Sequence, residues 1–397
     1  MSSRSPLHPL AFILGAVAMA GACGSFKNGS GSGGPTDGGG GGDTTASGSN
    51  SGGSSGSTSG GGSSGTGSGG GSSGGSSGTG SSGGSSGSSG SPGDACASNC
   101  SPCQGSACVT TMVLFGGDDT VNATVDTWTY DGAAWNNPAT ASAPPHREES
   151  AMAMLGGRVV LFGGSPSGQG DTIGDTWTFD GTTWTQEQPA HKPTPRCYHS
   201  MAALGGVVVL FGGTDGTTQL ADTWTWDGID WTQHVSPAPP ARQSAMMATL
   251  GETVVLFGGL GGGDGNTELS DTWTWNGSGW TQPTNPNSPS ARDSGMVGTV
   301  NGALVLFGGQ DINTNALNDT WTWSGSDWSE MNDLTLSPTG RFAAAAAVLG
   351  GKLVIFGGTT NQTNDFSDTW IFDGTQWYGG PTSGPTVRAW SAMAGPG

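Results

Sequence analysis

A phrase that recurs six times along the chain constrains its fold more than any other feature. The clearest copy reads R-V-V-L-F-G-G over residues 158–164, continues through a polar loop, and ends as D-T-W-T-F-D-G-T-T-W over residues 175–184. The second glycine of F-G-G and the tryptophan of D-T-W both recur at steps of 46 to 50 residues. Self-similarity at one fixed period indicates a single supersecondary unit that is stacked repeatedly.

Each repeat predicts four β-strands. An Arg-led stretch of small and apolar residues predicts the first strand, and the unbroken apolar run before F-G-G predicts a second strand covered on both faces. After a loop of variable length, T-W-T-W alternates with a period of two and leads into an Asp-Gly or Asn-Gly turn, so it predicts a hairpin of strands three and four. No window shows helical periodicity, and we expect an all-β domain.

The two ends of the repeat region complement each other. The first copy starts directly at its second strand, residues 112–115, and the last stretch, residues 388–393, is an Arg-led strand that no F-G-G follows. Joined, the two ends complete one sheet, so the ring closes without a free strand edge. The number of copies then predicts six sheets.

These features carry a family resemblance. Residues 109–397 resemble a kelch-type propeller in the double glycine after an apolar strand, the Arg-led strand and the spaced aromatic-Trp pair. The resemblance, which is also one to the central domain of galactose oxidase, implies a six-bladed kelch-type β-propeller whose blade 1 is closed by the C-terminal strand. Such a fold does not by itself imply an activity.

The N-terminus has the pattern of an export signal. Residues 1–22 contain Arg4 and then an apolar run of 13 residues, which is shorter than the roughly 20 residues needed to span a bilayer. The run ends Ala-Gly-Ala before Cys23, which resembles the lipobox of bacterial lipoproteins, although Ala20 stands where Leu is usual. The resemblance implies lipidation of Cys23 and a cell-envelope location, at the outer membrane facing the periplasm or the exterior. The alternative is ordinary cleavage near Ala22.

The stretch between this signal and the repeats divides into a linker and a Cys-rich segment. Residues 23–93 are rich in Gly and Ser and have little apolar surface to offset the entropy of ordering, so we predict a disordered, lipid-anchored tether. Residues 94–108 contain four cysteines, and the export signal favours two disulfides over zinc, with three pairings possible. These are Cys96, Cys100, Cys103 and Cys108. Cys197 then remains as an odd thiol, which we expect to be a buried apolar residue.

The charge of the chain excludes some partners. The net charge is -19, and from residue 109 onward 27 acidic side chains face 9 basic ones. A strongly anionic surface repels phosphate backbones and anionic lipid headgroups. We therefore expect no binding to nucleic acid and no contact with a membrane except through the lipid anchor.

Arg, Asp and Trp recur in every copy, and we expect these residues to be structural. A catalytic site in a propeller is asymmetric, whereas residues present in all blades typically bond loop amides, carbonyls or carboxylates. For the same reason we expect the periodic tryptophans in the core. The Arg positions are Arg147, Arg196, Arg242, Arg292, Arg341 and Arg388, and the Asp positions are Asp126, Asp175, Asp222, Asp271, Asp319 and Asp368.

Three motifs resemble sites of catalysis or metal binding without matching them. Residues 197–199, Cys-Tyr-His, resemble part of the copper site of galactose oxidase, but only four His residues follow the signal peptide. Residues 178–184 resemble the Asp box of six-bladed sialidases but lack the residue between Asp and Gly. Residues 118–119 and 264–268 are oxygen-rich without the full spacing of a calcium loop. We therefore assign no catalytic, metal-binding or cofactor-binding residue and expect no cofactor.

The loops from F-G-G to D-T-W differ in length and sequence from copy to copy. A repeated scaffold with varied loops is how repeat proteins present binding surfaces. We therefore predict a monomeric binding module for a protein or carbohydrate ligand. The alternative is an extracellular enzyme, a copper radical oxidase or a glycan hydrolase, with a single site at the central channel.

Overall fold

The computed structural model describes residues 109–119, 124–166, 171–262, 266–284, 287–361 and 364–397. The predicted signal peptide, Cys23, the Gly/Ser linker and the four cysteines of residues 94–108 lie outside these ranges. Within these ranges all of the regular secondary-structure elements are β-strands. None of the described residues forms a helix that is long and apolar enough to cross a membrane.

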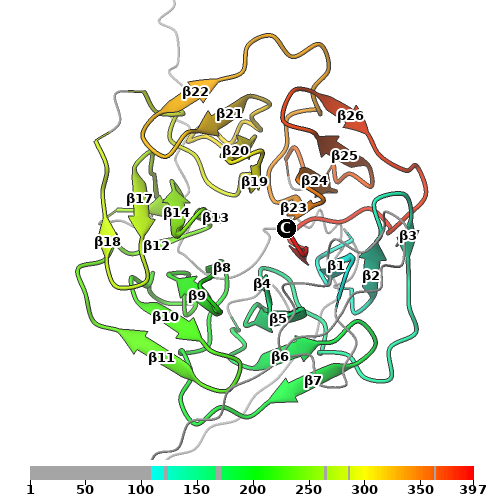
Figure 1. Ribbon diagram of the computed structural model, residues 1–397, viewed down its shortest axis with the longest axis vertical. Helices are drawn as coiled ribbons and strands as arrows, with labels where there is room; N and C mark the ends of the chain where they lie inside the picture. Colours follow the sequence, from blue (N-terminus) through cyan, green and yellow to red (C-terminus); the bar gives the residue numbers. More distant parts are fainter. Residues whose placement is uncertain (1–108, 120–123, 167–170, 263–265, 285–286, 362–363) are drawn as a thin grey trace, which may run out of the picture. The chain divides into compact units, whose positions relative to one another are not determined.

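The described residues form six four-stranded antiparallel sheets, or blades, which stand around a common centre (Figure 1). The strands below are given from the innermost to the outermost. Blade 1 contains β27 (Ala392–Ala394), β1 (Met112–Phe115), β2 (Thr127–Tyr130) and β3 (Trp135–Asn136); blade 2 contains β4 (Ala151–Leu155), β5 (Arg158–Phe162), β6 (Thr176–Phe179) and β7 (Trp184–Glu187); blade 3 contains β8 (Ser200–Leu204), β9 (Val207–Phe211), β10 (Thr223–Trp226) and β11 (Trp231–His234).

The other three blades follow the same plan. Blade 4 contains β13 (Met246–Leu250), β14 (Thr253–Phe257), β17 (Thr272–Trp275) and β18 (Trp280–Thr281); blade 5 contains β19 (Met296–Val300), β20 (Ala303–Phe307), β21 (Thr320–Trp323) and β22 (Trp328–Glu330); blade 6 contains β23 (Ala345–Leu349), β24 (Lys352–Phe356), β25 (Thr369–Phe372) and β26 (Trp377–Gly379). A further sheet has three short strands, β12 (Arg242–Gln243), β15 (Leu260–Gly261) and β16 (Thr267–Glu268). β12 precedes the first strand of blade 4, and β15 and β16 lie in the loop between β14 and β17.

The C-terminal strand completes the sheet that the N-terminal end of the domain begins. β27 pairs antiparallel with β1, with Val113 opposite Ala394 and Phe115 opposite Ala392. The inner strands contact one another in the cyclic order β4, β8, β13, β19, β23 and β27, and β27 contacts β4 in turn. This is the topology that the two incomplete end copies predict.

One Phe–Trp–Thr contact joins each blade to the next. The F-G-G phenylalanine packs against the first tryptophan of the outer strand of the following blade, with ring centroids 4.9 to 5.3 Å apart. That tryptophan donates its indole N–H to the first Thr of the third strand in the preceding blade, at 2.9 to 3.1 Å. The recurrence of these three residue types therefore follows from blade-to-blade packing.

The tryptophans that recur in all six blades fall into two groups. Those that start the outer strands are buried, as predicted. Those of D-T-W are only half-buried, and each donates its indole N–H to the Asp two residues earlier at 2.6 to 2.8 Å. The prediction that all periodic tryptophans lie in the core is correct for the first group alone.

Candidate functional site

Two kinds of connection meet where the F-G-G strands end, and we call this end of the propeller the loop end. One kind joins the second strand to the third within a blade, and the other joins the outer strand to the inner strand of the next blade. Their inner parts are paired, for example Glu148 with Ser165 and Asp293 with Gln310. The turns between the first and second strands lie at the opposite end of those strands, which we call the turn end.

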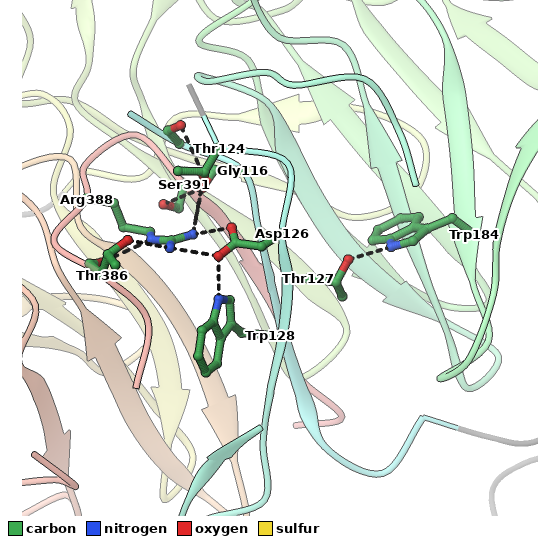
Figure 2. A network of polar contacts seen from close by, with 10 residues as sticks. Gly116, Thr124, Asp126, Thr127, Trp128, Trp184, Thr386, Arg388 and Ser391 are labelled. Atoms are coloured by element: carbon green, nitrogen blue, oxygen red, sulfur yellow. Dashed lines mark hydrogen bonds and ion pairs between the residues drawn. The ribbon is translucent and has the colours of Figure 1, made fainter. Parts of the chain in front are cut away.

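The periodic arginines lie at the loop end, and each one is bonded to other residues of the propeller. In every blade the guanidinium is buried and meets the D-T-W Asp through two contacts, the shorter of which measures 2.5 to 2.7 Å. It also donates to the carbonyl of the first glycine of F-G-G. In blade 1 this pair joins Arg388 to Asp126 and so links the two ends of the domain (Figure 2).

The aspartates of these pairs are held ionised. Burial opposes ionisation of each carboxyl group, but the hydrogen bonds and the charge of the arginine outweigh it, so the pKa of each Asp lies below its ordinary value. Their interpretation as structural residues is thus confirmed. The predicted bonds from turn amides go instead to the hairpin residues, such as Asp180.

Six residues that each follow a periodic Arg by two positions form a ring, which we call the collar. They are Glu149, Tyr198, Ser244, Ser294, Ala343 and Trp390. All six have φ between 53° and 61°. Each backbone N–H donates to the carbonyl of the collar residue in the preceding blade at 2.8 to 3.0 Å, from Tyr198 to Glu149 and onward until Glu149 donates to Trp390. The hydrogen bonds therefore make a closed circle of six.

The side chains of the collar are unequal, unlike its backbone. Trp390, Glu149 and Tyr198 are successive members and large, whereas Ser244, Ser294 and Ala343 are small. The Tyr198 hydroxyl donates to Glu149 Oε1 at 2.5 Å, and the Tyr198 and Trp390 rings meet edge to face with centroids 5.3 Å apart. Phe342 approaches Trp390 from the other side, at 6.1 Å. One half of the collar therefore carries large, mainly aromatic side chains, and the other half carries small ones.

Buried carboxyl groups stand in and beside the collar. Burial raises the pKa of Glu149 well above its ordinary value, and the charges of Glu148 and Asp118 raise it further, against the hydrogen bond from Tyr198. Burial likewise raises the pKa of Asp293 to about 7, with Ser294 opposing and Glu268 adding to the shift. Perturbed carboxyl groups of this kind are typical of functional sites, although structural networks produce them too.

The described residues supply no further cation to the collar. Apart from the six paired arginines, the lysines and arginines of this part are Arg158, Lys192 and Lys352. Arg158 and Lys352 begin second strands and so lie at the turn end, where they act on Asp180 and on Tyr378 and Asp373 respectively. Lys192 is exposed on the connection between blades 2 and 3. The centre of the loop end is therefore acidic.

Most of the exposed large apolar side chains lie at the same end. Of the six large hydrophobic residues that are exposed in the described part, five lie on the two kinds of connection that meet at the loop end. These five are Val125, Val235, Ile312, Leu336 and Val387. Val125 and Val387 are neighbours, because they adjoin the bonded pair Asp126 and Arg388.

The motif Cys-Tyr-His at residues 197–199 does not form one site. Tyr198 bonds Glu149, and His199 is buried against Phe162, with its pKa lowered to about 3 by burial and by the charge of Arg196. Cys197 is buried and disulfide-bonded, and every other cysteine of the chain lies outside the described residues. The predicted burial of Cys197 is confirmed, whereas the prediction that its thiol is left unpaired is wrong.

The disulfide of Cys197 constrains the other cysteine predictions. Within one chain, two disulfides among the four cysteines of residues 94–108 leave only Cys23 as a partner for Cys197. Lipidation would occupy the sulfur of Cys23. The predicted lipid anchor at Cys23 and the two predicted disulfides of residues 94–108 therefore cannot both be present in a chain whose Cys197 forms a disulfide within that chain.

The metal interpretations receive no support from the described residues. No group of three His, Cys, Asp or Glu side chains in those ranges could hold a metal ion. Asp264 and Gly265 of the oxygen-rich stretch lie outside them. Sequence reasoning missed the collar, although one signal was available: the second residue after each periodic Arg varies between large and small and between charged and apolar side chains.

Comparisons with known proteins agree with this architecture. Residues 94–259 match the family model described as the KLHDC2/KLHL20/DRC7 Kelch-repeats domain, and residues 340–382 match the Kelch motif. The second match spans the four strands of blade 6, from β23 to β26. No curated protein matches the chain.

Proposed function

The chain is a kelch-repeat protein, and from this premise we propose that its propeller is a protein-binding module that engages its partner at the loop end. The observation that carries the proposal is that five of the six exposed large apolar side chains of the described part lie on the loop-end connections, around an acidic centre. An excess of exposed apolar side chains at one end of a domain is a feature of interaction surfaces. The varied loops around them supply specificity, because the scaffold beneath is the same in every blade.

A protein fits this surface better than a carbohydrate does. A sugar would stack on the face of an exposed aromatic ring, but none of the large hydrophobic side chains that are exposed in the described part is a tryptophan. The proposal therefore retains the protein ligand and leaves the carbohydrate ligand as the alternative. No contact among the described residues favours the predicted enzymatic alternative.

Site-specific photo-crosslinking in the cells that make the protein tests this proposal. A benzophenone amino acid would replace Ile312, which is 67 % exposed on the loop between β20 and β21. The matched control places the same amino acid at Glu252, which is exposed in the turn between β13 and β14 at the turn end. We expect a discrete protein adduct from the first position and none from the second. Equal labelling at both positions, or labelling from the control alone, would contradict the proposal.

We propose in addition that the module is tethered to the cell envelope through Cys23, with the Gly/Ser stretch as the tether. Support comes from the lipobox-like sequence alone, because these residues lie outside the described ranges. The expected result is incorporation of labelled palmitate into the full chain and its loss in Cys23→Ser. Equal incorporation into both forms, or none into either, would exclude the anchor.

A further inference from the structure

We propose that the collar binds a cationic nitrogen group, the guanidinium or ammonium of an Arg or Lys side chain that a protein partner presents at the loop end. The inference rests on the proposed function and deepens it, because it names the chemistry that the centre of that surface recognises. Three independent observations carry it.

The first observation is a set of buried acceptors that lack a donor. Among the described residues, Glu149 Oε2 and Gln243 Oε1 have no hydrogen-bond partner, and their side chains belong to residues that are 4 % and 8 % exposed. Gln243 precedes the collar residue Ser244, and Glu149 is itself a collar residue. Buried polar atoms in folded proteins are nearly always satisfied. Gln243 Oε1 is an acceptor, and Glu149 Oε2 is an acceptor once its carboxyl group is ionised, so a cationic donor can satisfy both atoms.

The second observation is charge. Glu148 and Asp118 act on Glu149, and Glu268 acts on Asp293, while all six arginines at this end are spent on their aspartates. An anionic ligand would be repelled, and a cation would be attracted. Burial favours the protonated form of the carboxyl groups of Glu149 and Asp293, and a cation that binds beside them offsets the cost of burial, so that the proton is released to solvent.

The third observation is shape. Trp390 and Tyr198 present aromatic rings on one half of the collar, next to Phe342, and small side chains occupy the other half. Aromatic faces attract cations and also cover the methylene stem that carries them. A cation at the end of an apolar chain can pack against the aromatic rings and donate hydrogen bonds to the acceptors at the same time. A hydrated inorganic ion has no apolar stem to pack against the rings.

The chain contains an internal reporter for this site. It has three tyrosines, and only Tyr198 belongs to the collar. Tyr130 is buried in the apolar cluster between blades 1 and 6, and Tyr378 lies on β26, where the Lys352 ammonium approaches its ring at 5.5 Å. Full-length protein labelled with ¹³C at the tyrosine rings would therefore show one collar signal and two signals that report on folding.

The experiment titrates this protein with n-butylguanidinium chloride and, separately, with the neutral isostere n-butylurea. We expect a saturable shift of the Tyr198 signal alone with n-butylguanidinium, half complete at a concentration on the order of 1 mM for so small a probe. We expect n-butylurea to leave the signal in place. Absence of a shift with n-butylguanidinium, or an equal shift with n-butylurea, would overturn the proposal.

Two variants locate the site. Glu149→Gln keeps an acceptor for Tyr198 and removes the charge, so we expect binding about tenfold weaker or worse. The control Glu252→Gln removes one charge at the turn end and should leave binding unchanged. If Glu149→Gln fails to fold, Ser244→Trp provides the second test. It fills the half of the collar that has small side chains with the residue type found at Trp390, and we expect it to abolish binding. Unchanged binding in folded Glu149→Gln or in Ser244→Trp would overturn the assignment.

A blocked peptide, acetyl-Ala-Arg-Ala-amide, separates the two sources of the cation. Binding at least as tight as that of n-butylguanidinium supports a protein side chain, and exclusion of the peptide overturns that part of the proposal in favour of a free small amine. The outcome is independent of the crosslinking result. A collar that binds the cation without adducts at Ile312 refutes only the wider loop-end surface, and adducts without cation binding refute only the collar.

Discussion

Backbone strain at single residues is concentrated in the collar. A non-glycine residue in the left-handed region costs on the order of 1 kcal/mol, and here Glu, Tyr, Ser, Ala and Trp all adopt it. Each is held there by the bond that it donates to the preceding blade and by the one that it accepts from the next. The strain therefore belongs to the ring closure, while the side chains remain free to vary.

Asp293 makes this account testable at the residue scale. Its pKa of about 7 in the folded protein compares with about 3.9 in an unfolded chain, so the folded state keeps a proton that the unfolded state releases. The resulting stability is complete below about pH 4 and is lost as the pH rises through 7. Asp293→Asn mimics the protonated form, so we expect its advantage over wild type to grow with pH and to reach on the order of 4 kcal/mol by pH 8.

Urea unfolding of the two proteins at pH 5 and pH 8 measures this difference. The surface variant Asp333→Asn, which removes one negative charge from an exposed position, serves as the control. A wild-type protein that is equally or more stable than Asp293→Asn at pH 8 would show that the carboxyl group is ionised at little cost.

At the scale of strands and blades, the sequence predicts most of what the structure contains. The F-G-G strands, the D-T-W hairpins and the pairing of β27 with β1 all follow from periodicity and from the two incomplete copies. The reason is physical, because each of these residues repeats a contact with its own blade or the next one. The half-burial of the D-T-W tryptophans escaped prediction, since the apolar alternation of T-W-T-W does not show which indole bonds an Asp at the surface.

The candidate site was less predictable than the blades. Glu149, Tyr198 and Trp390 are separated by 49 and 192 residues in the chain, and only the circular arrangement of the blades brings them together. Cys197 shows the same limit. It was the cysteine left over once Cys23 and the four cysteines of residues 94–108 had been assigned, so a free thiol was predicted, but the structure gives it a disulfide. A residue whose role is peculiar to one blade leaves no periodic trace in the sequence.

At the scale of the whole propeller, three circles of contacts pass through every blade. They are the inner-strand contacts, the Phe–Trp–Thr contacts and the collar hydrogen bonds. Each circle crosses from blade 6 to blade 1, and the first and third do so through the last residues of the chain. The surface that we propose for recognition therefore forms only when the C-terminal strand is in place.

Hydrogen exchange of the full-length chain, followed by NMR, tests this dependence most directly. The Trp390 amide lies seven residues from the C-terminus at Gly397 and donates to Ala343. If the collar opens only as a unit, the free energy of exchange of Trp390 equals that of Ser244 and Ser294 on the far side of the circle. Exchange of Trp390 at the rate of a frayed chain end, while Ser244 and Ser294 stay protected, would contradict the closed collar.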